Sequence, residues 1–245
     1  MIRGEDDKGV SRVRIFLEDH AAKTAEADES VTSGCGVARF QSKAVPADLL
    51  QALLEAGCRT PSPWNLRPWQ FIVVCAEDKR RQVLRHCVEP GAACTAPVVI
   101  VAVANPRVWK QAPDRLAELV QQGTLSAGTQ AVHLSRIHRQ WSVGDAGRVF
   151  AIAQTHAALQ QISAAAAAQG LCTCWVHEFD APPLARLLHV PETLVLVGVL
   201  AVGYCAEAAP VPGPSLARCV FAEAYGLPWG LEPEDTRKKS DDEGF

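Results

Sequence analysis

Two short, almost wholly apolar segments constrain the fold of this chain more than any other feature. They are Ala96–Ala104 (APVVIVAVA) and Val195–Tyr204 (VLVGVLAVGY). Both are rich in β-branched residues, and both are too short to cross a lipid bilayer as a helix. An apolar run of this length, bounded by turn residues, is typical of a fully buried β-strand. The chain must therefore place further layers of structure around these two strands.

The segments around these strands alternate between helix and strand patterns. Pro46 and Asp48 precede leucines at helical spacing, and Trp69–Cys75 is a short run of aromatic and β-branched residues. Asp145 can cap a long alanine-rich helix that ends at Gly170. The remaining expected elements are helices over Asp78–Cys87 and Pro182–Leu188 and a strand over Leu171–Val176. This alternation favours an α+β or α/β layered domain.

The 245 residues suffice for one substantial core, and we expect a single domain over residues 34–230. Residues 1–33 are polar and are expected to form an N-terminal arm or helix. Residues 231–245 are charged and nearly free of core residues, so we expect a disordered tail. Asn105–Ser142 is less regular than its surroundings. We interpret it as an excursion over the surface, an insertion or a lid.

The charge and the cysteines argue against several classes of partner. The net charge is −3, so no attraction to nucleic acid or to a membrane surface is expected. Met1–Lys8 is polar and mixed in sign, unlike a signal peptide, and a cytoplasmic protein is expected. The nine cysteines include no Cys-x-x-Cys, so we expect no metal site and interpret most of them as small buried residues.

The most informative segment for function is the loop Cys58–Arg67 (CRTPSPWNLR), which precedes the strand Trp69–Cys75. Its prolines would hold the backbone amides and the side chains of Ser62 and Asn65 rigidly. Such groups can hydrogen-bond the polar edge of a planar ring, as proteins do when they orient a flavin. The same residues could instead cap backbone groups within a turn. The loop by itself leaves both interpretations open.

Several motifs, in the same order, resemble the nitroreductase family. They are Val37–Phe40, Ala44–Pro46, Leu49–Ala56 and Pro61–Val74, followed by Ala151–Asp180, Leu187–Glu192 and Val199–Tyr204. The resemblance covers about residues 37–230. It implies an α+β fold with a mixed sheet flanked by helices, which binds FMN. It also implies a domain-swapped homodimer with the flavin at the subunit interface, and the excess of apolar residues in Ala151–Ala168 favours such a partner.

The resemblance implies flavin contacts at particular residues. Pro61, Ser62, Pro63 and Asn65 match the family's loop that contacts the flavin ring and the ribityl chain. Gln154 matches a polar contact from the long helix.

Two further positions match those where the family places backbone amides near flavin N5 and O4, namely His177 and Glu178. A donor at N5 matters because N5 takes the hydride. Small residues are usual at the position of Glu178, and its charge would disfavour a reduced, anionic flavin unless the side chain turns away. Arg67 stands where relatives often have glutamine. It could stabilise reduced flavin or serve as a surface or dimer salt-bridge residue.

The phosphate anchor departs most from the family pattern. Small or apolar residues stand where basic or polar side chains are expected, at Gly34, Cys35, Ala38 and Leu216. Arg218 remains as a matching basic residue, and Arg39 lies one position from its expected place. The FMN phosphate normally needs cationic partners. Arg39, Arg12, Arg14 or the Gly34–Gly36 amides could supply the missing contacts, or the affinity for FMN is reduced.

We therefore expect an enzyme that transfers hydride from NADH or NADPH through flavin N5 to a nitroaromatic, a quinone or a similar small acceptor. One alternative is a flavin-processing or dehalogenating member of the superfamily, which residues 105–142 would decide. Another is a degenerate dimer that binds or stores flavin, or has lost it, without reductase activity. The anchor substitutions favour the degenerate dimer, whereas Ser62, Asn65 and Gln154 oppose it.

Overall fold

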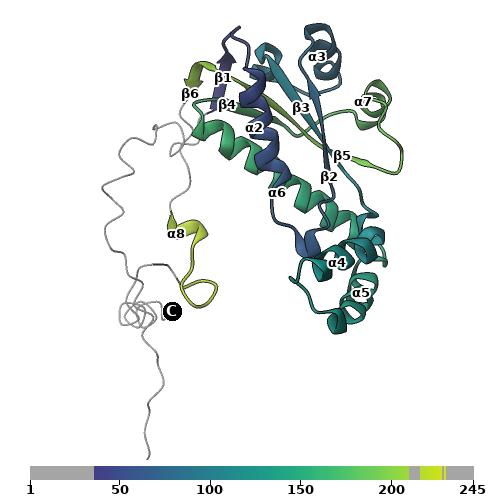
Figure 1. Cartoon of the computed structure of the whole chain (residues 1–245). Helices are drawn as coiled ribbons and strands as arrows, with labels where there is room; N and C mark the ends of the chain where they lie inside the picture. The colour runs from purple at the N-terminus through teal and green to yellow at the C-terminus, as the bar shows by residue number, and fades with distance from the viewer. Residues whose placement is uncertain (1–35, 210–215, 228, 230–245) are drawn as a thin grey trace, which may run out of the picture.

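The computed structural model describes residues 36–209, 216–227 and 229. A four-stranded sheet in the order β2-β3-β5-β4 lies at its centre (Figure 1). The strands are β2 (Trp69–Val74), β3 (Val98–Ala104), β4 (Cys172–Val176) and β5 (Val195–Gly203). Each neighbouring pair runs antiparallel, and Ile100 of β3 lies opposite Val73 of β2 and Leu200 of β5. The two apolar segments are confirmed as strands, and they form the inner pair of the sheet.

Alternate residues of β3 face two different cores, as the twofold period of a strand requires. The first core contains Val98, Ile100, Ala102 and Ala104, and the second contains Val99 and Val101. No residue of β3 is more than 3% exposed. The sheet is therefore covered on both faces.

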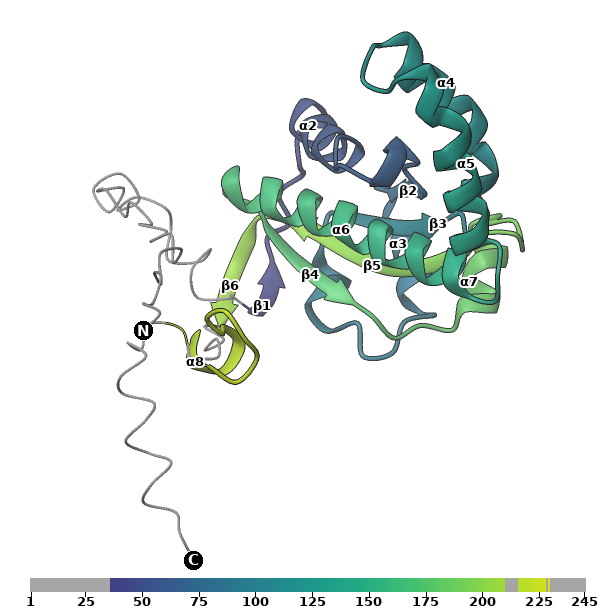
Figure 2. The same cartoon turned by 90° about the horizontal axis from the view of Figure 1, so that it is seen from below.

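Helices α2 (Ala47–Cys58) and α6 (Ala146–Ala168) cover the first face. Figure 2 shows α6 lying along the sheet with α2 beside it. The two helices approach closely at Gly57, where an added Cβ would lie 2.5 Å from Cγ1 of Ile162. Ile162 itself is completely buried, so its side chain has no free space to move into.

The second face carries α3 (Glu77–Leu84), α7 (Ala181–Leu187) and the 3-10 segment η2 (Gly91–Thr95). A two-stranded antiparallel sheet of β1 (Gly36–Phe40) and β6 (Cys205–Ala209) adjoins this face. Phe40 is buried in the second core, and its N–H donates to Thr95 Oγ1 at 2.9 Å. This bond ties β1 to η2.

Residues 105–142 are more regular than their sequence indicates, because most of them are helical, and their interpretation as an insertion or lid stays a prediction. The segment forms η3 (Val108–Gln111), α4 (Ala112–Gln121) and α5 (Ala127–Trp141), at one end of the molecule (Figure 1). These elements enclose a third core, which contains Leu66, Val108, Ala112, Leu116, Ile137 and Trp141. Both helices are amphipathic, and Leu116, Leu119 and Val120 of α4 recur at helical spacing, so the local pattern was an available signal. Their packing around Leu66, which comes from a distant loop, depends on the tertiary structure.

Two smaller expectations are also corrected. Asp145 precedes α6, but its backbone is not extended and its side chain makes no capping hydrogen bond. None of the eight described cysteines is fully buried: four are exposed and four are partly buried. Cys58 and Cys75, for example, lie where α2 and β2 end and the chain leaves the core.

The other expected helices and strands are present with boundaries shifted by at most a few residues, and the α+β fold class is confirmed. The expected arm over residues 1–33 and tail over 231–245 lie outside the described residues, as do Arg12, Arg14, Gly34 and Cys35. Within the described ranges, no helix is long and apolar enough to span a membrane.

We predict that Gly57→Ala destabilises the fold by about 1–3 kcal/mol, because the new methyl group would overlap Ile162 in a packed core. Gly128→Ala on α5 is the matched control, since an added Cβ there has no neighbour within 4 Å. Alanine should stabilise that helix by at most about 1 kcal/mol. Urea denaturation measures both free energies of unfolding. Equal stability of the two variants would contradict the close approach of α2 and α6.

Candidate functional site

The loop between α2 and β2 has a strained backbone. Trp64, Asn65 and Arg67 have φ angles of 50°, 55° and 46°, in the left-handed region that favours glycine. Each such residue other than glycine costs on the order of 1 kcal/mol, somewhat less for asparagine. Residues in unfavourable backbone conformations persist only where the surrounding structure holds them, and they are frequent at active and ligand-binding sites. The loop is therefore the first candidate for a functional site.

Side chains within the loop hold this conformation. The hydroxyl oxygen of Ser62 accepts the backbone N–H of Arg67 at 2.9 Å. Asn65 Oδ1 accepts Nε–H of Arg67 at 2.7 Å. Ser62 and Asn65 thus accept hydrogen bonds within the turn, which is one of the two roles that the sequence left open. Arg67 donates both bonds and so stabilises the loop. Ser62 retains a hydroxyl hydrogen and Asn65 an amide NH2 group, both of which are hydrogen-bond donors.

Aromatic contacts fix the loop to the rest of the molecule. The Trp64 indole N–H donates to His133 Nδ1 at 3.2 Å, and its ring packs edge-on against Trp141, with centroids 5.1 Å apart. Trp141 in turn stacks on Phe150 of α6 at 4.1 Å. Gln154 lies one helical turn beyond Phe150, so it projects from the same side of α6. This aromatic chain links the loop, α5 and α6.

A second candidate site lies where α6 meets the end of β4. The rings of Trp175 and His177 are nearly parallel, with centroids 5.3 Å apart, and His156 stacks on Trp175 at 5.9 Å. A hollow of about 500 Å³ is lined by His156, Ala157, Gln160, Trp175 and His177. The sequence prediction included His177 but missed His156 and Trp175. The available signal was the spacing of Trp175, on β4, and His177, directly after it, because residues two apart in extended chain lie on the same side.

The backbone after β4 is held by a short antiparallel pairing. Val88 N–H donates to the carbonyl of Glu178, and Asp180 N–H donates to the carbonyl of His86, both at 2.8 Å. The side chains of His177 and Glu178 are exposed. Glu178 forms none of the salt bridges found among the described residues. The segment therefore presents both side chains to solvent from a fixed backbone.

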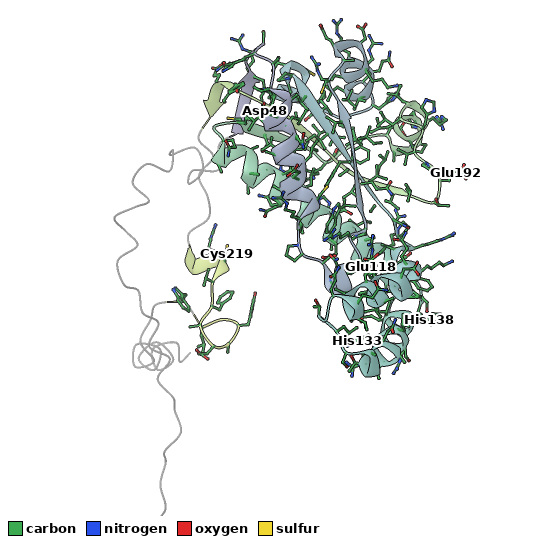
Figure 3. The ribbon with its side chains drawn as sticks, viewed as in Figure 1. Asp48, Glu118, His133, His138, Glu192 and Cys219 are labelled. Carbon is green, nitrogen blue, oxygen red and sulfur yellow. The ribbon has the colours of Figure 1, made fainter. Side chains whose placement is uncertain are left out.

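The two predicted arginines lie elsewhere. Arg39 is exposed and lines a different hollow, of about 870 Å³, together with Arg80 and Arg81 of α3. Arg218 is exposed on the short helix α8 (Leu216–Cys219). Figure 3 marks this helix by Cys219, which lies apart from His133 and His138 on α5. One chain therefore does not bring Arg39, Arg218 and the Pro61–Arg67 loop together.

Burial controls the titration of several groups. It raises the pKa of the Cys87 thiol to about 11, with a smaller contribution from Cys94, and it also raises the pKa of Cys174. These thiols stay protonated near neutral pH and are poor nucleophiles. Burial, and then the neighbouring His177, lowers the pKa of His156 from 6.5. Among the described residues, no group of three or more His, Cys, Asp or Glu side chains could hold a metal ion.

We predict that His177→Gln raises the pKa of His156, because it removes the second of the two effects that lower it. NMR titration of the imidazole C–H signals measures this shift. An unchanged titration of His156 would contradict the contact between the two rings.

The folded-state pKa of His156 lies below its unfolded value, so protonation favours unfolding as the pH falls through about 6.5. His156→Gln should accordingly reduce the loss of stability below that pH.

Comparison with known proteins agrees with this arrangement. The chain is 28% identical to "NADH dehydrogenase" of Thermus thermophilus over 173 residues, which are 70% of this chain and 82% of the relative. It is 26% identical to Protein DrgA of Synechocystis over 167 residues, 64% of this chain and 73% of that protein.

The fold is also found among solved structures. A protein of Exiguobacterium sibiricum, solved in complex with FMN, superposes with a TM-score of 0.69 at 15% identity, covering 80% of this chain and 96% of that one. The sequence model described as "Nitroreductase family" matches residues 37–204. Because this match extends over more than half of the sequence and agrees with the observed fold, the chain belongs to the nitroreductase family.

Proposed function

We propose that this protein is an FMN-dependent oxidoreductase that acts on small molecules. The observation that carries the proposal is the strained Pro61–Arg67 loop. Ser62 and Asn65 accept the hydrogen bonds that hold this loop, so the hydroxyl hydrogen of Ser62 and the amide NH2 group of Asn65 can donate to a ligand. The carbonyls of a flavin ring and the hydroxyls of its ribityl chain accept such donors. Pro61 and Pro63 are exposed beside them, so a ligand can reach the loop. The residues present therefore fit a flavin ring.

The hollow between α6 and β4 supports the second part of the site. Trp175 and His177 offer parallel rings on which a flat ligand can lie. The backbone of His177 and Glu178, kept in place by its pairing with residues 86–88, would face the reactive edge of the ring. Gln154 would add a polar contact from α6. The exposed carboxylate of Glu178 can turn into water, which limits its repulsion of a reduced flavin.

A homodimer follows from the distribution of these residues. The loop, the α6–β4 hollow and Arg218 occupy separate places in one chain, so a complete site needs groups from two chains. Helix α6 supports this, because Ala153, Ala157 and Ala164 are exposed on it. A stripe of small residues allows another helix to approach closely. Arg218, and Arg39 with it, would be the remaining cationic partners of the phosphate.

Bound FMN would supply hydride transfer from NADH or NADPH to a nitroaromatic, a quinone or a similar small acceptor. The family name supports a nitro acceptor, and the name "NADH dehydrogenase" of the Thermus thermophilus relative supports a nicotinamide donor. The protein's own groups bind and orient the ring. No side chain is required to move a proton, which agrees with the protonated, partly buried thiols of Cys87 and Cys174 and the lack of a catalytic triad among the assigned residues. The preferred nucleotide, and the cytoplasmic location expected from the sequence, stay predictions.

The absorbance spectrum of the purified protein tests the proposal. We expect flavin bands that disappear when NADH or NADPH is added without oxygen and return when a quinone is added. A protein with flavin bands that neither nucleotide bleaches would be a flavin carrier, the degenerate dimer considered above. A colourless protein that takes up no added FMN would contradict flavin binding altogether.

We predict that Asn65→Ala weakens FMN binding by about 1–2 kcal/mol, or roughly 5- to 30-fold, because it removes a hydrogen bond to the flavin. Arg67→Ala is the control, since it removes the internal partner of Asn65 and leaves the amide in place. Fluorescence titration with FMN measures both affinities. If Arg67→Ala costs as much as Asn65→Ala, the role of Asn65 is confined to holding the loop.

A further inference from the structure

A basic hollow of about 410 Å³ opens beside the Pro61–Arg67 loop, and its two arginines belong to none of the groups assigned above. It is lined by Trp64 of the loop and by Arg136, Arg139 and Gln140 of α5. The three α5 residues are spaced three and four apart, so they share one face of the helix. That face is the one turned toward Trp64.

Within the described part of the chain, no carboxylate neutralises the charge of this hollow. Arg136 and Arg139 are exposed, and no carboxylate lines the hollow. The salt bridges found among the described residues use Arg59, Arg81 and Arg115, each with a glutamate on its own helix. Arg136 and Arg139 take part in none of them. A favourable interaction with the helix dipole could explain an arginine near the end of α5. It does not explain why Arg136 and Arg139 both line a hollow with Trp64.

The aromatic wall of the hollow is rigid. Trp64 is held by its left-handed backbone, by the bond from its indole N–H to His133 and by its edge-on contact with Trp141. Trp64 belongs to the proposed flavin loop, next to Asn65 in the chain, and it also lines the hollow together with Arg136 and Arg139. A ligand in the hollow would therefore contact both arginines beside the flavin loop.

We propose that Arg136 and Arg139 bind an anionic group, a phosphate or a carboxylate, on the redox partner that approaches the flavin loop. Planar guanidinium groups suit both anions, because each presents a fork of donors to two oxygens. The ligand's planar ring packs against Trp64. This inference rests on the proposed function and defines its substrate class: the preferred partners carry negative charge. The anion belongs either to the nicotinamide dinucleotide or to the acceptor.

Half-reaction kinetics separate these two sources. In the double variant Arg136→Gln/Arg139→Gln, bleaching by NADH or NADPH tests the dinucleotide, and reoxidation by 4-nitrobenzoate against neutral nitrobenzene tests the acceptor. We expect the second-order rate constant to fall about tenfold for whichever partner supplies the anion, because charge-assisted hydrogen bonds are lost. The rate constant of reoxidation by nitrobenzene should stay unchanged. Arg107→Gln, an exposed arginine outside the hollow, is the matched control. Equal changes for charged and neutral partners, or no change, would overturn the proposal.

Binding of anions can be measured without any reaction of the flavin. Such a measurement tests the anion site separately from the proposed function. The indole N–H signal of Trp64, identified by its loss in Trp64→Phe, is followed by NMR during titration with inorganic pyrophosphate, benzoate and neutral benzamide. At least one of the anions should shift it in the wild type but not in the double variant, whereas benzamide should not. Failure of both anions in the wild type would refute the anion site even if the protein reduces acceptors. Dissociation of the dimer by the double variant would instead assign the arginines to an interface and would also overturn the proposal.

Discussion

Strand β3 has no residue more than 3% exposed, so both faces of the sheet at this position have to be covered by other elements. The hydrophobic free energy of these side chains is gained only when α2 and α6 pack on one face and α3, α7 and η2 on the other. The close approach at Gly57 shows how tightly one of these layers fits. The Pro61–Arg67 loop and the hollow between α6 and β4 adjoin elements that this packing holds in place.

The Pro61–Arg67 loop leaves the first core and enters the third. Leu66 is buried among residues of η3, α4 and α5, while Trp64 contacts His133 and Trp141. These contacts stabilise three left-handed residues that would be unfavourable in an isolated peptide. The helical end of the molecule therefore does two things. It holds the loop, and it presents Arg136 and Arg139 beside it.

Cationic groups are distributed unusually for a protein proposed to bind FMN. The residues matched to the phosphate anchor supply little charge, and Arg39 and Arg218 lie apart in one chain. Positive charge is instead available at the α5 hollow, close to Trp64. Binding energy could thus come more from the ring contacts and less from the phosphate than the family pattern implies. The arginines of α5 would then contribute to the choice of redox partner.

The sequence alone determined the buried strands, the long helix α6 and the family resemblance, because each depends on local apolar periodicity or on motifs in order along the chain. Ser62 and Asn65 were identified in the same way, but their bonds to Arg67 were not, since these depend on the folded loop. The helices α4 and α5 were missed although their apolar residues recur at helical spacing, whereas their packing around Leu66, far away in the chain, depends on the fold. His156 and Trp175 likewise meet His177 only when α6 crosses β4. Contacts between distant segments, which no local pattern encodes, were decided by the tertiary structure alone.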